Sequence, residues 1–286
     1  RAQRAPITLP THLAQAPFKM PAAVAFQGLA SGAHPATTFP NAHLLHPSVE
    51  STAEAKWSAS QAGSPLQELQ QAVKDEDWTR DYEEGLTSIG MRADWSATPE
   101  RCNFLGAVAS SSKARRVLEI GSFCGVAALS LAESLPEDAQ VQSLEIDPFV
   151  VKFGASFRAK SSAGRKITTH VGPAMASLER MAQQVRSGKL EPFDFVVIDA
   201  DKEGMRGYFD LLWNTQGLLS KQAVVCVDLT PFKGQPPLRY VKYGFPYTWE
   251  ASSGQKQIDE LRSNVAASSQ FASHEVGQLL VVHRVQ

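Results

Sequence analysis

Between residue 116 and the C-terminus, short apolar runs alternate with longer segments in which apolar residues recur at helical spacing. A strand repeats every two residues and a helix about every 3.6, so the short runs predict strands and the longer segments predict helices. Such alternation is typical of a parallel sheet with helices on both faces. The predicted strands are 116–120, 141–146, 167–171, 193–198 and 222–227, and the predicted helices are 125–135, 148–162, 174–187, 203–219 and 254–268.

Two further patterns flank this region. An amphipathic helix is predicted before it by Leu66, Leu69, Val73 and Trp78, and Thr98 followed by Pro99 marks the start of another helix. At the C-terminal end, residues 270–275 and 279–285 are separated by the turn Val276-Gly277, which indicates an antiparallel hairpin. The sequence therefore predicts an α/β domain over 64–286, whose mostly parallel sheet ends in antiparallel strands.

The first 49 residues have a different composition. They contain no Asp or Glu, seven prolines and many alanines, and no periodic apolar face persists there. Such a segment cannot bury a core of its own. We therefore expect residues 1–63 to form an extended N-terminal arm that docks on a protein partner.

The same acid-poor composition bears on location. Leaders of organellar precursors are rich in Arg and Ala and poor in acids. The segment is therefore interpreted either as what remains of such a leader, which predicts an organelle and specifically a plastid, or as an ordinary disordered tail of a cytoplasmic protein.

Overall composition excludes several classes of protein. The formal net charge is −1, so the chain has no general attraction for nucleic acid. No run of about 18 apolar residues is present that could cross a membrane. The three cysteines, Cys102, Cys124 and Cys226, are too widely spaced for a zinc site or a disulfide framework, which suits a reducing compartment.

A glycine loop follows the first predicted strand. Glu119, Gly121 and Gly125 form an E-x-G-x-x-x-G pattern between that strand and an apolar helix. Glycine allows a tight turn and close approach of a ligand to the main chain. The pattern lacks the third glycine of a dinucleotide fingerprint. It resembles the first motif of the S-adenosylmethionine-dependent methyltransferases. The alternative is that these glycines only form the turn after an ordinary parallel strand.

Acidic residues end three other predicted strands. Glu145 and Asp147 lie at the end of the second strand, where a carboxylate can bind the two hydroxyls of a ribose, and both are candidates. Later, Asp199, Asp201 and Lys202 end one strand and Asp228 ends the next. The carboxyl ends of parallel strands meet at one edge, so these carboxylates are expected to converge there. Carboxylate oxygens suit a hard cation such as Mg²⁺.

Taken together, these motifs resemble a known family. From about residue 99 the chain resembles the cation-dependent O-methyltransferases, the caffeoyl-CoA and catechol O-methyltransferase family. The matching segments keep the family's order and nearly its spacing, and they are 99–105, 117–121, 135–138, 171–174 and 198–202. The resemblance implies a Rossmann-like class I methyltransferase fold that uses S-adenosylmethionine to methylate a small hydroxylated, catechol-like acceptor.

The resemblance also implies roles for individual residues. Glu145 would hold the ribose hydroxyls of the cofactor, Asp199 and Asp228 would bind a divalent cation, and Lys202 would be the general base. The full set of implied cofactor-binding residues is Met91, Glu119, Gly121, Ser122, Gly125, Glu145, Ala174 and Asp199.

One departure from the family pattern weakens the predicted metal site. The family places Asn after the aspartate that corresponds to Asp228 and uses its carbonyl as a ligand, but here Leu229 offers no oxygen. We therefore expect Mg²⁺ binding to be weak or absent. The alternative interpretation is a catalytically impaired methyltransferase fold that serves as a structural or assembly subunit of a larger organellar complex. A homodimer is compatible with either.

Overall fold

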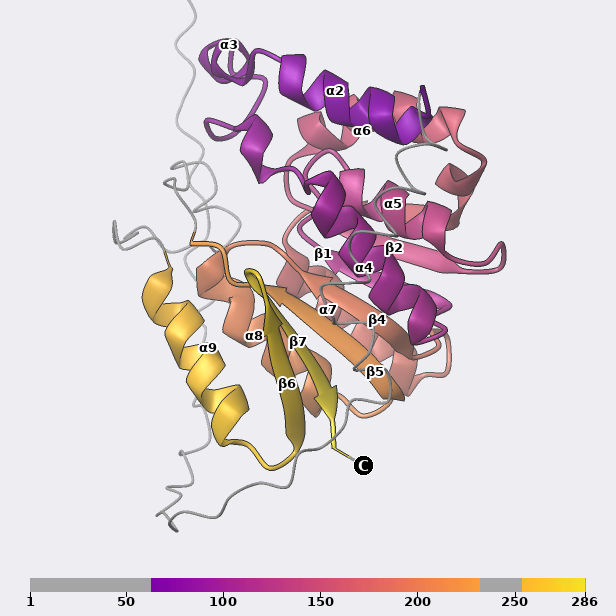
Figure 1. The fold of residues 1–286 in the computed structure, drawn as a ribbon, viewed down its shortest axis with the longest axis vertical. Coiled ribbons are helices and arrows are strands. Elements are labelled where there is room, and N and C mark those ends of the chain that lie inside the picture. Colours follow the sequence, from indigo (N-terminus) through magenta and orange to yellow (C-terminus); the bar gives the residue numbers. More distant parts are fainter. Residues whose placement is uncertain (1–62, 232–253, 286) are drawn as a thin grey trace, which may run out of the picture. The chain divides into compact units, whose positions relative to one another are not determined.

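The computed structural model describes residues 63–231 and 254–285, and these form a seven-stranded sheet with helices on both faces (Figure 1). The strand order is β3-β2-β1-β4-β5-β7-β6. The first five strands in this order, from β3 across to β5, are parallel to one another. Strand β7 is antiparallel to both of its neighbours, β5 and β6. The strands are β1 (Arg116–Ile120), β2 (Gln140–Glu145), β3 (Ile167–Val171), β4 (Phe193–Ile198), β5 (Leu219–Asp228), β6 (Phe271–Val276) and β7 (Leu279–Arg284).

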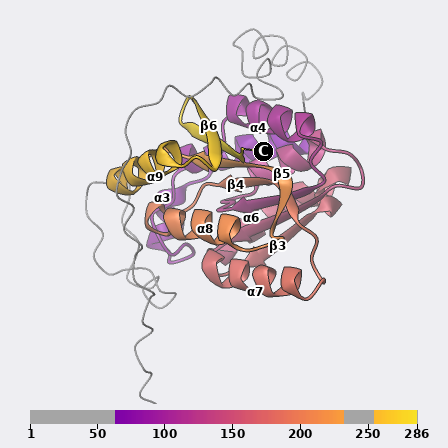
Figure 2. The same ribbon diagram turned by 90° about the horizontal axis from the view of Figure 1, so that it is seen from below.

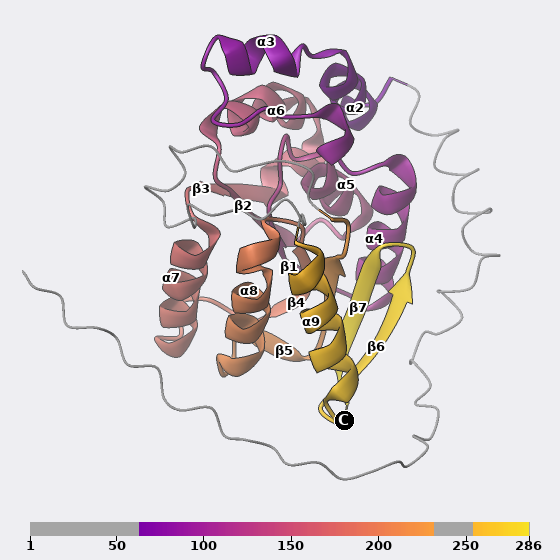
Figure 3. The same ribbon diagram turned by 90° about the vertical axis from the view of Figure 1, so that its left-hand side faces the viewer.

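The helices form two layers around the sheet. One face is covered by α7, α8 and α9, and the other by α4, α5 and α6, with α2 packed on α6 (Figures 2 and 3). The helices are α2 (Pro65–Asp75), α3 (Trp78–Glu83), α4 (Pro99–Ser111), α5 (Val126–Ser134), α6 (Pro148–Lys160), α7 (Ala174–Arg186), α8 (Lys202–Asn214) and α9 (Gln255–Ala267), with short 3₁₀ turns η2 (Ala93–Trp95) and η3 (Ser162–Lys166).

The sheet is buried on both faces, which explains its uninterrupted apolar runs. Alternate residues of β1 face opposite layers: Leu118 and Ile120 pack against α7 and α8, whereas Val117 packs against α4 and α5. The three cysteines are buried and unpaired, as expected for small core residues. Among the described residues, no helix is both long and apolar enough to cross a membrane.

Polar caps fix where several helices begin at the carboxyl edge of the sheet. The side chain of Thr98 accepts a hydrogen bond from the main-chain N–H of Arg101 at the start of α4. Asp147 caps α6 by accepting from Phe149, and Asp201 caps α8 by accepting from Gly204. A capping oxygen satisfies one of the unpaired N–H groups of a helix's first turn. These caps therefore hold three helix starts beside the strand ends, where the site lies.

The structure confirms the predicted fold class and the antiparallel end of the sheet. The two-residue connection from β6 to β7 contains Gly277 at φ 58°, as the hairpin pattern predicts.

Two predicted boundaries were wrong. The helix expected to reach residue 219 ends at Asn214, because Thr215 is extended and Gly217 adopts φ 80°, so β5 starts earlier than predicted. Trp78 does not continue the preceding helix, because Asp77 caps a new one and the Trp78 indole N–H donates to Val73 O at 2.9 Å. The predicted arm, apart from residue 63, lies outside the described residues.

Candidate active site

A cavity of about 450 Å³ opens at the carboxyl ends of β1, β2, β4 and β5. Ligands of open α/β sheets bind at this edge. The structure brings nearly all of the predicted site residues into its wall, although they come from six separate segments of the chain. Those that line it are Met91, Glu119, Gly121, Ser122, Glu145, Ala174, Asp199, Lys202 and Asp228.

The glycine loop is shaped by close contact with the end of β4. Gly121 adopts φ 85°, and a Cβ atom there would lie 2.1 Å from the main-chain oxygen of Asp199. Its N–H donates to Leu144 O at 2.9 Å, which ties the loop to β2. Gly125, at φ 83°, starts α5 behind the loop and does not line the cavity. The close contact with β4 therefore requires a glycine at position 121, whereas Gly125 supplies the turn into the helix.

Glu145 organises the same loop. One carboxylate oxygen accepts from the N–H groups of Ser122 and Phe123, at 3.1 and 2.7 Å, and the other accepts from Ile146 and Asp147, at 2.8 and 3.0 Å. Burial raises the pKa of Glu145, and these main-chain bonds oppose the shift. Four bonds fill the four lone-pair positions of a carboxylate. A ribose would therefore have to exchange with, or share, the loop's own N–H groups.

Asp147, the other candidate for the ribose, has a structural role. It is buried, and its two oxygens accept from the N–H groups of Phe149 and Ser88, at 2.8 and 2.9 Å. These bonds cap α6 and hold the segment before α4 against it. Of the two alternatives, Glu145 is the one that faces the cavity.

Glu119 lies in the cavity wall but is 1% exposed. Its nearest hydrogen-bond partner is the Ser143 hydroxyl, which donates at 2.9 Å. Burial raises the pKa of Glu119 to about 8, and the carboxylates of Asp199 and Glu145 add to the shift, while the Ser143 bond opposes it. Its pKa would fall if a cation bound beside it, because a positive charge favours the ionised form.

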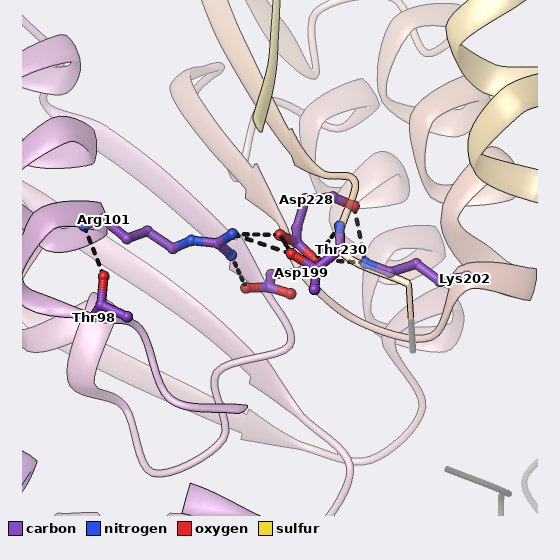
Figure 4. A network of polar contacts seen from close by, with 6 residues as sticks. All are labelled: Thr98, Arg101, Asp199, Lys202, Asp228 and Thr230. Atoms are coloured by element: carbon purple, nitrogen blue, oxygen red, sulfur yellow. Dashed lines mark hydrogen bonds and ion pairs between the residues drawn. The ribbon is translucent and has the colours of Figure 1, made fainter. Parts of the chain in front are cut away.

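Asp228 is the centre of the polar edge of the cavity (Figure 4). It is 2% exposed, and both oxygens are occupied. Oδ2 accepts from Lys202 Nζ at 2.8 Å and from the N–H of Thr230 at 3.1 Å. Oδ1 accepts from Arg101 Nη2 at 2.6 Å and from the Thr230 hydroxyl at 2.8 Å. Burial alone would raise the pKa of Asp228, but Lys202 and Arg101 outweigh burial and hold that pKa below its ordinary value.

The predicted acidic residues differ in what they contact. Asp199 Oδ2 accepts from Arg101 Nη1 at 3.0 Å, so one guanidinium bridges Asp199 and Asp228. Burial and the nearby Asp228 carboxylate raise the pKa of Asp199. Asp201 contacts its own helix, accepting from Gly204 N at 2.5 Å and from the Tyr208 hydroxyl at 2.7 Å. The expected convergence therefore involves two aspartates, and Asp201 is a helix cap.

Lys202 is buried, and its ammonium donates to the side chain and to the main-chain oxygen of Asp228, at 2.8 and 2.9 Å. It reaches Asp228 from the side opposite to Arg101 (Figure 4). The role of Lys202 as a general base stays a prediction.

The residues present do not fit a divalent cation. Leu229 is 4% exposed and packs in the core against α8 and α9, so it offers no ligand. Within the described residues, no group of three or more His, Cys, Asp or Glu side chains is placed to hold a metal. The cationic side chains of Arg101 and Lys202 already bind both oxygens of Asp228 and one oxygen of Asp199. Mg²⁺ requires several oxygen ligands in near-octahedral geometry, and this edge does not supply them.

Sequence reasoning missed Arg101 and Thr230. Arg101 falls within the recognised segment 99–105, but a single arginine in the first turn of a helix looks like a surface residue. A usable signal was present, because a cation at a helix N-terminus opposes the helix dipole and needs a nearby acid to be favourable. That signal points to an ion pair with a carboxylate beside the start of α4.

Comparisons with known proteins identify the family of this chain. The O-methyltransferase family model matches residues 83–236, more than half of the chain. The mouse catechol O-methyltransferase domain-containing protein 1 is 32% identical over 125 residues, which cover 44% of this chain and 47% of that protein. A caffeoyl-CoA O-methyltransferase of Zinnia elegans is 29% identical over 168 residues, covering 55% and 66%. The matches thus span from about half to nearly two thirds of these relatives.

Solved structures show the same fold. The O-methyltransferase TomG of Streptomyces achromogenes, in complex with SAM, has a TM-score of 0.57 at 22% identity and covers 78% of this chain and 90% of its own. An O-methyltransferase from Bacillus cereus, in complex with SAH, has a TM-score of 0.56 at 22% identity, with the same coverage. The chain belongs to the O-methyltransferase family, and the predicted family is confirmed.

The first prediction concerns the contact of Gly121 with β4. Gly121→Ala should lower the free energy of unfolding by roughly 2–5 kcal/mol, since it combines a left-handed backbone penalty with overpacking against main-chain atoms. Gly188→Ala is the matched control, because Gly188 has φ 68° and open space around its Cβ position, and it should lose only about 1–2 kcal/mol. Urea unfolding compares the two. Equal losses would show that the contact with Asp199 O is unimportant.

A second prediction follows from the buried Glu119. Its folded-state pKa, about 8, lies above the ordinary value of 4.5, so the folded state keeps a proton that the unfolded chain releases between these pH values. Stability should therefore fall as pH rises through that window. Glu119→Gln removes this loss and should be more stable than the parent by a few kcal/mol at pH 8, at about 1.4 kcal/mol per pKa unit.

The difference between Glu119→Gln and the parent should shrink toward pH 4.5. Glu191→Gln is the control, since the Glu191 side chain is 80% exposed. It should leave the pH dependence of unfolding unchanged. If the stability of Glu119→Gln equals that of the parent at every pH, the raised pKa of Glu119 would be contradicted.

Proposed function

We propose that this chain is an S-adenosylmethionine-dependent O-methyltransferase that acts on a small hydroxylated aromatic acceptor. The cavity supports this proposal most directly, because a glycine loop, the acid that ends β2 and the polar edge of β4 and β5 meet there. The chain's membership of the O-methyltransferase family supports the same function. Its volume of about 450 Å³ lies in the range of small-molecule sites.

The cofactor half is formed by the loop and its carboxylates. Gly121 and Ser122 bring main-chain groups to the cavity, and Glu145, which also lines it, would bind the ribose hydroxyls. The buried Glu119 offers a group that ionises beside a positive charge. Ala174, at the start of α7, and Met91, in an apolar cluster with Trp78, form further wall. This arrangement suits a ligand with a ribose at one end and positive charge near the loop.

When bound, S-adenosylmethionine would supply an electrophilic methyl group: an acceptor oxygen would attack the methyl carbon in line, the carbon–sulfur electron pair would leave with S-adenosylhomocysteine, and the hydroxyl proton would be released. The chain's contribution is mainly positioning, which can supply much of such a rate enhancement. Trp95 and Phe123 stand in the cavity wall with ring centroids 6.3 Å apart, and they provide apolar surface for an aromatic acceptor. At the polar edge of the cavity, Arg101 binds the carboxylates of Asp199 and Asp228, and Lys202 binds that of Asp228.

The alternative of a structural subunit receives no support from the relatives described above, whose names are those of enzymes or of an enzyme domain. The docking of the arm and the plastid location concern residues outside the described part and stay predictions.

The test combines binding and turnover. Calorimetric titration should show S-adenosylhomocysteine binding to the parent protein. Glu145→Ala should weaken it roughly ten- to hundredfold, the effect of losing about 1.5–3 kcal/mol from a hydrogen bond to a charged group. Incubation with S-adenosylmethionine and a panel of phenols should release S-adenosylhomocysteine from at least one acceptor.

Glu137→Ala is the control, because Glu137 is an exposed acid whose side chain is 65% accessible, and its affinity should match the parent. An unchanged affinity in Glu145→Ala would contradict the ribose assignment. No binding of S-adenosylhomocysteine by the parent would contradict the proposed function as a whole.

A further inference from the structure

We propose that the guanidinium of Arg101 takes the place that cation-dependent O-methyltransferases give to a divalent metal ion, so that this chain holds its acceptor without a metal. The inference deepens the proposed function, since it concerns the acceptor end of the same cavity. Its test measures metal binding and does not depend on turnover.

The position of the guanidinium is the first argument. Nη1 donates to Asp199 Oδ2 at 3.0 Å and Nη2 to Asp228 Oδ1 at 2.6 Å, so Arg101 lies between the two aspartates that the family resemblance assigns to a metal. Figure 4 shows the side chain extending from α4 across to both of them. A fixed planar fork suits two carboxylates held at one distance.

Charge balance is the second argument. Asp199 and Asp228 contribute two negative charges, and Arg101 and Lys202 contribute two positive ones. Each oxygen of Asp228 already accepts two hydrogen bonds. A divalent cation would add repulsion from both side chains and find no vacant lone pair on Asp228. It could enter only if Arg101 left.

The rest of the edge is consistent with the loss of the metal. Leu229 packs in the apolar core, where the family has a ligand. The main-chain N–H of Arg101 is held by the Thr98 cap at 3.3 Å, and this fixes the helix turn from which the side chain extends. A cation in a helix's first turn is unfavourable by itself. The two carboxylates therefore compensate Arg101, and Arg101 competes with any other cation for them.

This arrangement has a consequence for the acceptor. A divalent ion can chelate two neighbouring hydroxyls, whereas a guanidinium donates hydrogen bonds and accepts none. Arg101 lines the cavity and uses three contacts, while a guanidinium carries five N–H bonds. It can therefore hold a single hydroxyl or phenolate oxygen. We expect acceptors with one hydroxyl to be methylated as readily as vicinal diols.

The experiment measures Mn²⁺ binding by electron paramagnetic resonance on the full chain. The parent should show no saturable site at Mn²⁺ concentrations up to the millimolar range. The double variant Arg101→Ala/Leu229→Asn empties the position and restores a ligand oxygen, and it should gain one site at least tenfold tighter than any binding by the parent. Arg101→Gln/Leu229→Asn serves if the alanine variant fails to fold.

The control is Arg262→Ala/Leu229→Asn. Arg262 also bridges two carboxylates, those of Asp259 and Glu275, but on an exposed surface, so this protein should gain no site. A single Mn²⁺ site in the parent that disappears in Asp199→Asn would overturn the inference. So would the absence of Mn²⁺ binding in both folded Arg101 variants. Either result leaves the S-adenosylhomocysteine titration unaffected, so failure of this inference is distinguishable from failure of the proposed function.

Discussion

The buried carboxylate of Asp228 is the interaction on which the acceptor half of the site depends. An isolated charge is very costly to remove from water, so a carboxylate that is 2% exposed needs cationic partners and hydrogen bonds. Lys202 supplies one partner from α8 and Arg101 the other from α4. These helices cover opposite faces of the sheet, and one side chain at the end of β5 thus connects both layers at the edge where the cavity opens.

The cofactor half depends on main-chain contact more than on charge. Gly121 brings the loop against the end of β4, and Glu145 gathers four N–H groups from the loop and the start of the next segment. These contacts determine the shape of the cavity wall before any ligand is present. The two halves are therefore built differently. The cofactor half is formed by a close approach of main-chain segments that requires glycine, and the acceptor half by a balanced set of buried charges.

The sequence predicted the layers of the fold well, because strand and helix periods and the final hairpin are local properties. It could not separate Glu145 from Asp147, since both are acids at one strand end and only the direction of each side chain decides which faces the cavity. The helix expected to end at residue 219 was too long because no local residue other than Gly217 marks its end. Arg101 escaped prediction for another reason. Its partners lie 98 and 127 residues away in the chain, and only the folded sheet brings them together.

The loss of a metal ligand at Leu229 was visible in the sequence and suggested a weakened site. The structure changes the meaning of that loss, because a side-chain cation fills the space and leaves the pair of aspartates neutralised. If Arg101 replaces the metal ion, its guanidinium should stay between Asp199 and Asp228 when the cofactor site is filled. The most direct measurement is a crystal structure of the complex with S-adenosylhomocysteine, grown in Mn²⁺, with anomalous diffraction recorded for manganese. We expect Arg101 between Asp199 and Asp228 and no anomalous peak there, whereas a manganese peak between the two carboxylates, with Arg101 displaced, would show that a metal ion occupies the site.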